Sequence, residues 1–426
     1  MITRALLIVA AAAGLALAAS APALAAQPYP INFKNFPLSS YASISGTAVS
    51  GETVTLASSG LGSFAYTDPF ANYAGDGADG SGTYQSGTWV SPDTTLSFPF
   101  NELVASWNAT TPEGTWIQVE MQPQMLDGHW AKWYILGRWS SSDSDFHRTS
   151  VGGQGDADGY VAIDTFFAKD HAAVAYRLRV TLFRRAGSSA TPTLRRLSAV
   201  AMNLTNQKMR FPSRSTVTSE VDLGLPQYSQ EIHHGDFPQY DNGGEAWCSP
   251  TSTSMVVRYW GAAYAPTPSE YQWVTDALGA SHPDPWVDFT ARAVYDYHYN
   301  GAGNWPFNAA YAASRGLVAD VTALHDLREA EPFVEAGIPL VASVAWNSNK
   351  LDGGIKSTNG HLMVIGGFTA NGNVIAYDPA SDTDALVRHV YDREQFERAW
   401  IPASGGIVYL IHPAGWTTPP LTANNS

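Results

Sequence analysis

Cysteine and basic residues are both scarce in this sequence of 426 residues. Cys248 is the only cysteine, which excludes an internal disulfide framework, so packing has to stabilise the fold. Lys and Arg number 24 against 38 Asp and Glu, and the net charge of −14 argues against nucleic acid or anionic lipid as a partner. Beyond the N-terminus, no stretch approaches the roughly 20 apolar residues of a spanning helix. We therefore expect no membrane span in the mature chain.

The N-terminus has the pattern of a secretory signal peptide. Arg4 precedes an apolar run rich in Ala and Leu, and Ala23-Leu24-Ala25 provides a small-x-small cleavage pattern. Residues 1–25 are therefore predicted to be removed. The mature protein is expected to be secreted, either into a periplasm or out of the cell.

Short runs of alternating apolar and polar residues fill residues 26–205, separated by clusters of Gly, Ser, Asp and Asn. This period of two, without amphipathic helices, predicts an all-β sandwich of jelly-roll-like type. The region is rich in tryptophan, which we interpret mainly as core packing. The alternative is an aromatic platform for a glycan or a cell-surface ligand, made from Trp89, Trp107, Trp116, Trp130, Trp133 and Trp139.

Hydrophobic periodicity is lost over residues 206–225, which predicts a linker. The pattern beyond it predicts an α+β domain over residues 226–413, followed by a C-terminal tail over 414–426. Expected helices begin at Cys248 and cover 269–278, 287–295, 307–315 and 324–336. Expected strands cover 338–344, 361–368 and 374–379, and an Asn-Gly turn joins the last two as a hairpin.

Cys248 lies at the predicted start of a helix. Gly243 and Gly244 precede it, Pro250 suits a first helical turn, and an apolar stripe that includes Met255 follows. Free backbone N–H groups and the helix dipole at this position favour a negative charge, so a thiolate forms more easily there. A lone cysteine is more often an inert buried side chain, but the apparent export of the chain favours a functional thiol.

His361 and Asp378 supply the other two groups that a cysteine nucleophile needs, which are a base and an orienting carboxylate. His361 opens one predicted hairpin strand and Asp378 closes its neighbour, so both are expected at the same end of the sheet. We therefore predict catalytic roles for Cys248, His361 and Asp378.

An oxyanion hole also needs donors, and the backbone N–H of Cys248 is one candidate. Gln230, Gln239 and Asn242 are available for the second, and spacing alone does not choose among them. The remaining histidines show no metal-ligand spacing, so no metal and no cofactor are expected.

The Trp247-Cys248-Ser249-Pro250 helix start, the Gly360-His361-Leu362 strand and the Tyr377-Asp378-Pro379 strand end resemble the bacteriocin-processing, or double-glycine, peptidases, which are papain-like. The resemblance covers about residues 226–413 and leaves the β-sandwich unrecognised. It implies a papain-like fold with Cys248 as nucleophile, His361 as general base and acid, and Asp378 as orienter. The family's oxyanion glutamine lies shortly before the cysteine, where this chain has Asn242, so the role passes to Gln230 across an inserted loop.

The resemblance implies a secreted, stand-alone relative that acts on a peptide or protein. Leader processing at a membrane exporter is not expected, because the chain has an export signal and no transporter domain. One alternative is a cell-wall peptide hydrolase or amidase, although such enzymes often orient the histidine with a second histidine. The other is a non-catalytic surface or glycan-binding protein with a degenerate peptidase scaffold.

Overall fold

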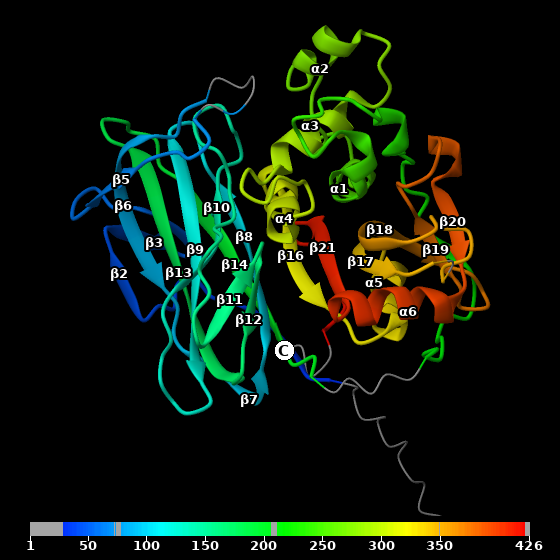
Figure 1. Cartoon of the computed structure of the whole chain (residues 1–426), viewed down its shortest axis with the longest axis horizontal. Helices are drawn as coiled ribbons and strands as arrows, with labels where there is room; N and C mark the ends of the chain where they lie inside the picture. The colour runs from blue at the N-terminus through cyan, green and yellow to red at the C-terminus, as the bar shows by residue number, and fades with distance from the viewer. Residues whose placement is uncertain (1–28, 72, 74–77, 206–210, 349, 422–426) are drawn as a thin grey trace, which may run out of the picture.

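The computed structural model of the chain describes residues 29–71, 73, 78–205, 211–348 and 350–421. Two parts lie side by side, an all-β part in the N-terminal half and a mixed α/β part in the C-terminal half (Figure 1). The predicted signal peptide, residues 1–25, falls outside the described residues. No helix in the described ranges is long and apolar enough to cross a membrane.

The N-terminal part consists of strands joined by turns. The strands are β1 Ile31–Asn35, β2 Ser43–Ser45, β3 Thr47–Ser50, β4 Thr53–Leu56, β5 Gly62–Tyr66, β6 Gly82–Val90, β7 Thr94–Phe100, β8 Glu102–Thr110, β9 Thr115–Met125, β10 Tyr134–Trp139, β11 Gly159–Ala162, β12 Thr165–Ala168, β13 Ala173–Arg185 and β14 Thr193–Met202. In the described residues they form two antiparallel sheets, ordered β11-β12-β8-β14-β4-β3 and β10-β9-β13-β6-β2. β1 joins the first sheet beside β14, whereas β5 and β7 join the second beside β6 and β13.

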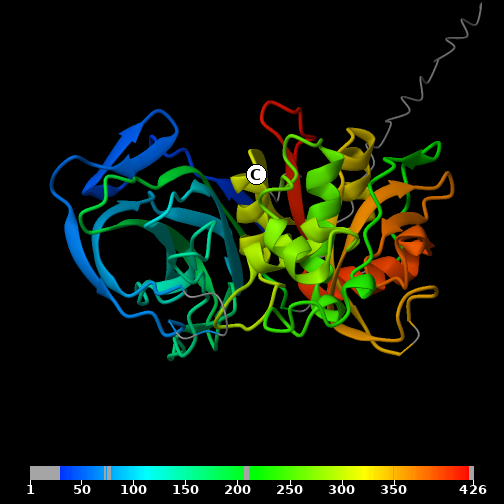
Figure 2. The same cartoon turned by 90° about the horizontal axis from the view of Figure 1, so that it is seen from above.

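The two sheets face each other around a buried interior (Figure 2). Along β13, Leu178, Val180 and Leu182 are fully buried and alternate with the partly exposed Arg177 and Arg179. An all-β sandwich is therefore confirmed, and its cause is the period-two pattern. The finer jelly-roll-like arrangement stays a prediction.

The tryptophans of the sandwich divide into two groups. Four of the six are completely buried, namely Trp89, Trp107, Trp116 and Trp139. Trp130 and Trp133 are partly exposed and lie against the guanidinium groups of Arg177 and Arg179. Core packing therefore accounts for most of the set, as the sequence indicated.

The C-terminal part is an antiparallel sheet with helices packed against it. Its strands are β15 Val221–Asp222, β16 Leu317–Ala323, β17 Leu340–Trp346, β18 Thr358–Phe368, β19 Val374–Tyr377, β20 Arg388–Tyr391 and β21 Ile407–Pro413. They pair in the order β16-β21-β17-β18-β19-β20, with β15 beside β18. The helices are η1 Glu231–His233, η2 Gly244–Ala246, α1 Cys248–Tyr259, α2 Gln272–Leu278, α3 Pro285–Val294, α4 Trp305–Ser314, α5 Leu327–Glu335, η3 Asp384–Leu386 and α6 Arg393–Ser404.

Each of the helices predicted from periodicity is present to within a few residues, as are the strands of the predicted hairpin. The longer elements that were not predicted are β16, β20, β21 and α6, and the short β15, η1, η2 and η3 were not predicted either. α6 contains Pro402, a residue that ordinarily argues against a helix interior. Tertiary packing decides its form, because Phe396, Trp400 and Ile401 are fully buried.

The stretch read as a linker is attached to the C-terminal part. The Ser213 backbone N–H donates to Glu397, and the Thr216 backbone N–H and hydroxyl both donate to Glu331. In the predicted tail, Trp416 donates to the Ala336 carbonyl oxygen and packs against Trp260. Backbone and side-chain donors in these segments therefore bind the C-terminal part, in two cases through the buried carboxylates of Glu331 and Glu397, and their lack of hydrophobic periodicity did not reveal this.

Strand β16 docks the C-terminal part onto the sandwich. The Asn108 amide imitates a strand partner, since it donates to the Ala319 carbonyl oxygen at 2.6 Å and accepts from the Ala319 N–H at 3.3 Å. Asp320, 1% exposed, accepts from Arg196 at 2.8 Å and from Ser198 at 2.6 Å. Polar contacts that are specific in direction thus fix the two parts relative to each other.

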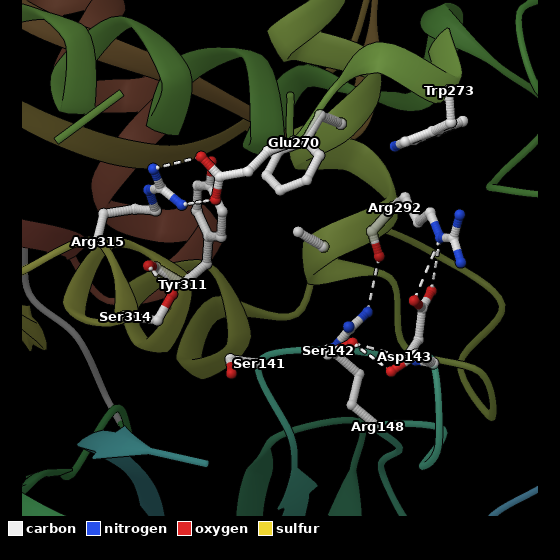
Figure 3. A pocket seen from close by; sticks show the side chains of 13 residues that line it. Ser141, Ser142, Asp143, Arg148, Glu270, Trp273, Arg292, Tyr311, Ser314 and Arg315 are labelled. Atoms are coloured by element: carbon white, nitrogen blue, oxygen red, sulfur yellow. Dashed lines mark hydrogen bonds and ion pairs between the residues drawn. The ribbon is translucent and has the colours of Figure 1, made fainter. Parts of the chain in front are cut away.

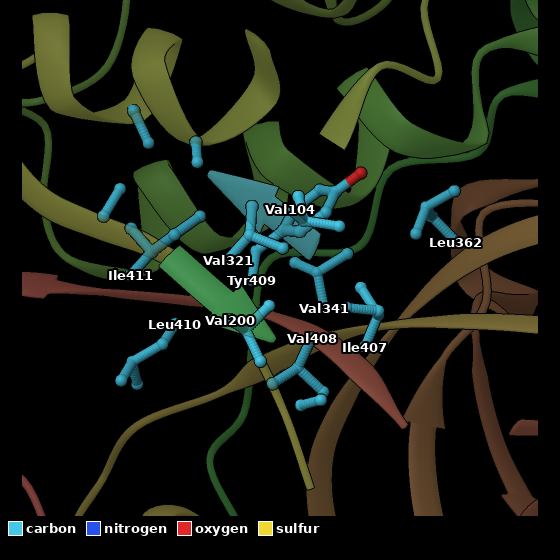
Figure 4. Close-up of a cluster of buried hydrophobic side chains, with 14 of the residues drawn as sticks. Val104, Val200, Val321, Val341, Leu362, Ile407, Val408, Tyr409, Leu410 and Ile411 are labelled. Atoms are coloured by element: carbon cyan, nitrogen blue, oxygen red, sulfur yellow. The ribbon is translucent and has the colours of Figure 1, made fainter. Parts of the chain in front are cut away.

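Apolar packing continues across the same junction. Val104 and Val200 of the sandwich lie in one cluster with Val321, Tyr409 and Ile411 of the C-terminal sheet (Figure 4). All five are buried. One hydrophobic core therefore spans both parts.

Candidate functional site

Cys248 is the first residue of α1, as predicted. The preceding Trp247 is fully buried, and its indole N–H donates to the Tyr240 carbonyl oxygen at 2.6 Å. Behind this turn, a Cβ on Gly244 would lie 2.2 Å from the Gln230 carbonyl oxygen, so only glycine fits. Cys248 itself is partly exposed and unbridged, so a buried turn presents its thiol at a helix N-terminus.

His361 and Asp378 meet at the end of the β18–β19 hairpin. Val364 pairs with Tyr377, which places His361 and Asp378 on adjacent strands at diagonal positions. The His361 Nε2 atom lies 2.7 Å from Asp378 Oδ1, and both side chains are at most 3% exposed. The ionised carboxylate fixes the Nε2–H tautomer, which leaves Nδ1 for another partner.

The Cys248 side chain is the other group that acts on the imidazole, since it is among those that raise the pKa of His361. Burial alone would lower the pKa of His361, but the Asp378 charge, its hydrogen bond and the Cys248 contact together raise the pKa. Burial would raise the pKa of Asp378, but His361, Tyr391 and the Ala380 N–H hold it below its ordinary value. Both shifts favour an imidazolium beside a carboxylate, and the imidazolium in turn favours a thiolate at Cys248.

Two aromatic side chains complete this arrangement, and no sequence pattern pointed to either of them. The Tyr391 hydroxyl on β20 donates to Asp378 Oδ2 at 2.6 Å. Trp346 packs edge-on against the His361 ring, with centroids 6.0 Å apart. Tyr391 restrains the carboxylate, and Trp346 covers the imidazole.

The three oxyanion-hole candidates lie in different environments. Gln230 is buried, and its Nε2 atom donates to the Glu245 carbonyl oxygen at 2.7 Å, three residues before Cys248. Its backbone N–H donates to the Pro379 carbonyl oxygen, next to Asp378. By contrast, Asn242 is exposed, and the Gln239 carbonyl oxygen accepts from Tyr73 of the sandwich. Gln230 is therefore the candidate that contacts segments beside both Cys248 and Asp378.

A separate cavity of about 410 Å³ lies between the sandwich and the C-terminal part (Figure 3). Two ion pairs border it: Arg315 donates to Glu270 through two nitrogens, and the Arg292 Nε–H is shared between the two oxygens of Asp143. None of the predicted site residues lines it. We therefore assign the cavity to the domain junction and not to the candidate active site.

Two sequence-family models match the chain. Residues 38–202 match the sequence model described as Peptidase C39 N-terminal domain, and residues 223–408 match that of the Peptidase_C39 like family. The chain resembles the C39-type cysteine peptidases. The resemblance to papain-like peptidases, predicted from the sequence, is thereby confirmed. The sandwich is the region that matches the model of the Peptidase C39 N-terminal domain.

A solved structure described as a candidate C39-like peptidase from Bacillus anthracis is similar to part of this chain at 16% sequence identity. The alignment has a TM-score of 0.27 and covers 45% of this chain and 97% of that one. No curated protein matches the chain. The comparisons give no support for a glycan ligand of the sandwich.

Proposed function

We propose that this protein is an exported cysteine peptidase that cleaves peptide bonds through a thioester acyl-enzyme. The observation that carries the proposal is the hydrogen bond between His361 and Asp378, together with Cys248 at the start of α1 near this pair. The C39-type family acts on peptides or proteins, which supports the same substrate class here. The pattern of residues 1–25 supports export.

In the proposed first step, the Cys248 thiolate attacks the carbonyl carbon of the scissile bond. The tetrahedral oxyanion is held by the Cys248 backbone N–H and the Gln230 side-chain amide. His361 then transfers its proton to the departing amine, and the C–N bond breaks to leave a thioester.

In the proposed second step, His361 takes a proton from water as the water attacks the thioester carbonyl. The C–S bond breaks, the acid product leaves, and the thiolate and imidazolium are restored. Asp378 stays ionised throughout. It keeps Nε2–H in place so that Nδ1 faces the sulfur and the substrate.

The experiment that tests this proposal is covalent labelling followed by turnover. A thiol-directed epoxide peptide should label wild type once, at Cys248, and a peptide-library assay should then give products that disappear in Cys248→Ala. Cell-wall peptides serve as a second library, since an amidase would act on those alone. Turnover by Cys248→Ala equal to wild type would refute the proposal.

A further inference from the structure

Four side chains that could bind a metal meet in the C39-like domain, and none of them is a predicted catalytic residue. His233 lies on η1, Asp236 in the following turn, His282 in the loop after α2 and Asp288 on α3. One ligand atom from each lies within 4.8 Å of the others. His233 and Asp288 are completely buried, whereas the side chains of His282 and Asp236 are 9% and 16% exposed.

The distances between nitrogen and oxygen atoms describe a closed ring. His233 Nδ1 lies 3.1 Å from Asp288 Oδ2 and 3.5 Å from Asp236 Oδ2. His282 Nε2 lies 3.1 Å from the same Asp288 oxygen and 3.4 Å from the same Asp236 oxygen. A tetrahedral ion with ligand bonds of about 2.0–2.1 Å has edges of about 3.3–3.4 Å between its ligands, and the four nitrogen–oxygen spacings lie close to that value.

Hydrogen bonding within the cluster leaves several buried polar atoms without a partner. Both ring nitrogens of His233 and Asp236 Oδ2 make no hydrogen bond within the described part of the chain. Buried groups of this kind are normally hydrogen-bonded or bind a metal. Two neutral imidazoles and two carboxylates carry a charge of −2, which one divalent cation neutralises.

We propose that these four residues bind a structural zinc-class ion. Two imidazole nitrogens with two carboxylate oxygens select a tetrahedral transition metal of the zinc type over calcium or magnesium, which prefer more ligands, all of them oxygens. Four protein ligands leave no open position, as in structural sites. The proposal replaces the expectation of no metal, which rested on sequence spacing. The ligands are spread over residues 233–288, so they do not form a short sequence motif that would predict a metal site.

The ion would fasten η1 to α3. η1 also carries contacts to the nucleophile turn, since Gly244 packs against the His233 and Gln230 backbones. The Gln230 side chain reaches the Glu245 carbonyl oxygen in that turn. A bound ion would therefore restrain the segment that packs against the turn before Cys248. Its role is to position that turn.

The test measures metal in tag-free protein carrying Cys248→Ala, so that no ion can bind the thiol. After chelator treatment and dialysis against zinc, elemental analysis should give one zinc per chain. Cobalt(II) loading should give the intense visible d–d bands of tetrahedral coordination without sulfur-to-metal charge transfer. Folded protein that takes up no zinc, or cobalt with an octahedral spectrum, would overturn the proposal.

Substitutions then locate the ion. His282→Ala should weaken zinc binding by more than about 100-fold, because even loss of an outer-shell partner costs about 10–100-fold. His234→Ala is the matched control, since His234 adjoins His233 but is 67% exposed and pairs with Glu245. If His282→Ala does not fold, Asp236→Asn provides the second variant. Zinc binding that survives the cluster substitutions, or is lost equally in His234→Ala, contradicts the site.

Discussion

His361 and Asp378 are 17 residues apart in the chain, and their Nε2 and Oδ1 atoms are 2.7 Å apart in the structure. The β18–β19 hairpin makes this possible, because its register brings the start of one strand beside the end of the next. The contact fixes which imidazole nitrogen faces Cys248. The proposed chemistry depends on that choice of tautomer.

The first prediction concerns the rate at which Cys248 reacts with iodoacetamide as pH varies. Wild type should keep a high rate into the mildly acidic range, because the raised pKa of His361 preserves a positive charge beside the sulfur. His361→Ala should lose this plateau and react appreciably only as pH approaches the ordinary thiol range near about 8.5. The same profile in both proteins would indicate a structural cysteine and favour the non-catalytic alternative.

The second prediction concerns Tyr391→Phe, which removes the hydroxyl that donates to Asp378 but keeps the ring. That hydrogen bond lowers the pKa of Asp378, so its loss raises this pKa. The acid limb of the alkylation profile should therefore move to higher pH by about one to two units, since a hydrogen bond to a charged group is worth about 1.5–3 kcal/mol.

The control for Tyr391→Phe is Tyr377→Phe on the neighbouring strand. The Tyr377 hydroxyl donates to Asp222 at 2.7 Å instead of to Asp378. Its removal should leave the acid limb unchanged. If the acid limb shifted equally in the two variants, the cause would be a general destabilisation of the sheet and not the loss of the hydrogen bond to Asp378.

The third prediction distinguishes the oxyanion-hole candidates once a substrate is known. Gln230→Ala should lower kcat by about 100- to 1000-fold, as loss of one oxyanion donor does, while Cys248 alkylation stays near the wild-type rate. Gln239→Ala and Asn242→Ala should leave kcat within a few-fold of wild type. A large loss of kcat in either control, with Gln230→Ala active, would assign the oxyanion-hole role to that control residue instead.

The fourth prediction tests the junction between the two parts of the chain. Asp320→Ala leaves Arg196 and Ser198 without their shared acceptor, so the free energy of unfolding should fall by about 3–5 kcal/mol. Glu394→Ala breaks an exposed ion pair with Arg398 and should change the free energy of unfolding by less than about 1 kcal/mol. Urea denaturation measures both, and a small effect of Asp320→Ala would mean that the junction contributes little.

The sequence alone determined the local structure around Cys248 and the hairpin that bears His361 and Asp378. Glycine, proline and an apolar stripe specify a helix start, and an Asn-Gly turn specifies strand register, because both depend on neighbours in the chain. The all-β nature of the sandwich followed in the same way from its period of two. These are short-range rules, so a single sequence is enough to apply them.

Only the tertiary structure decided which distant groups meet. Tyr391 reaches Asp378 because β20 is placed beside β19, and Gln230 reaches Glu245 because the segments around η1 and η2 pack together. His233 and Asp288 lie together because η1 packs near α3. The docking of β16 onto the sandwich likewise depends on burial of surfaces separated by many residues. Such contacts arise from packing the whole core, for which no local spacing in the chain gives a signal.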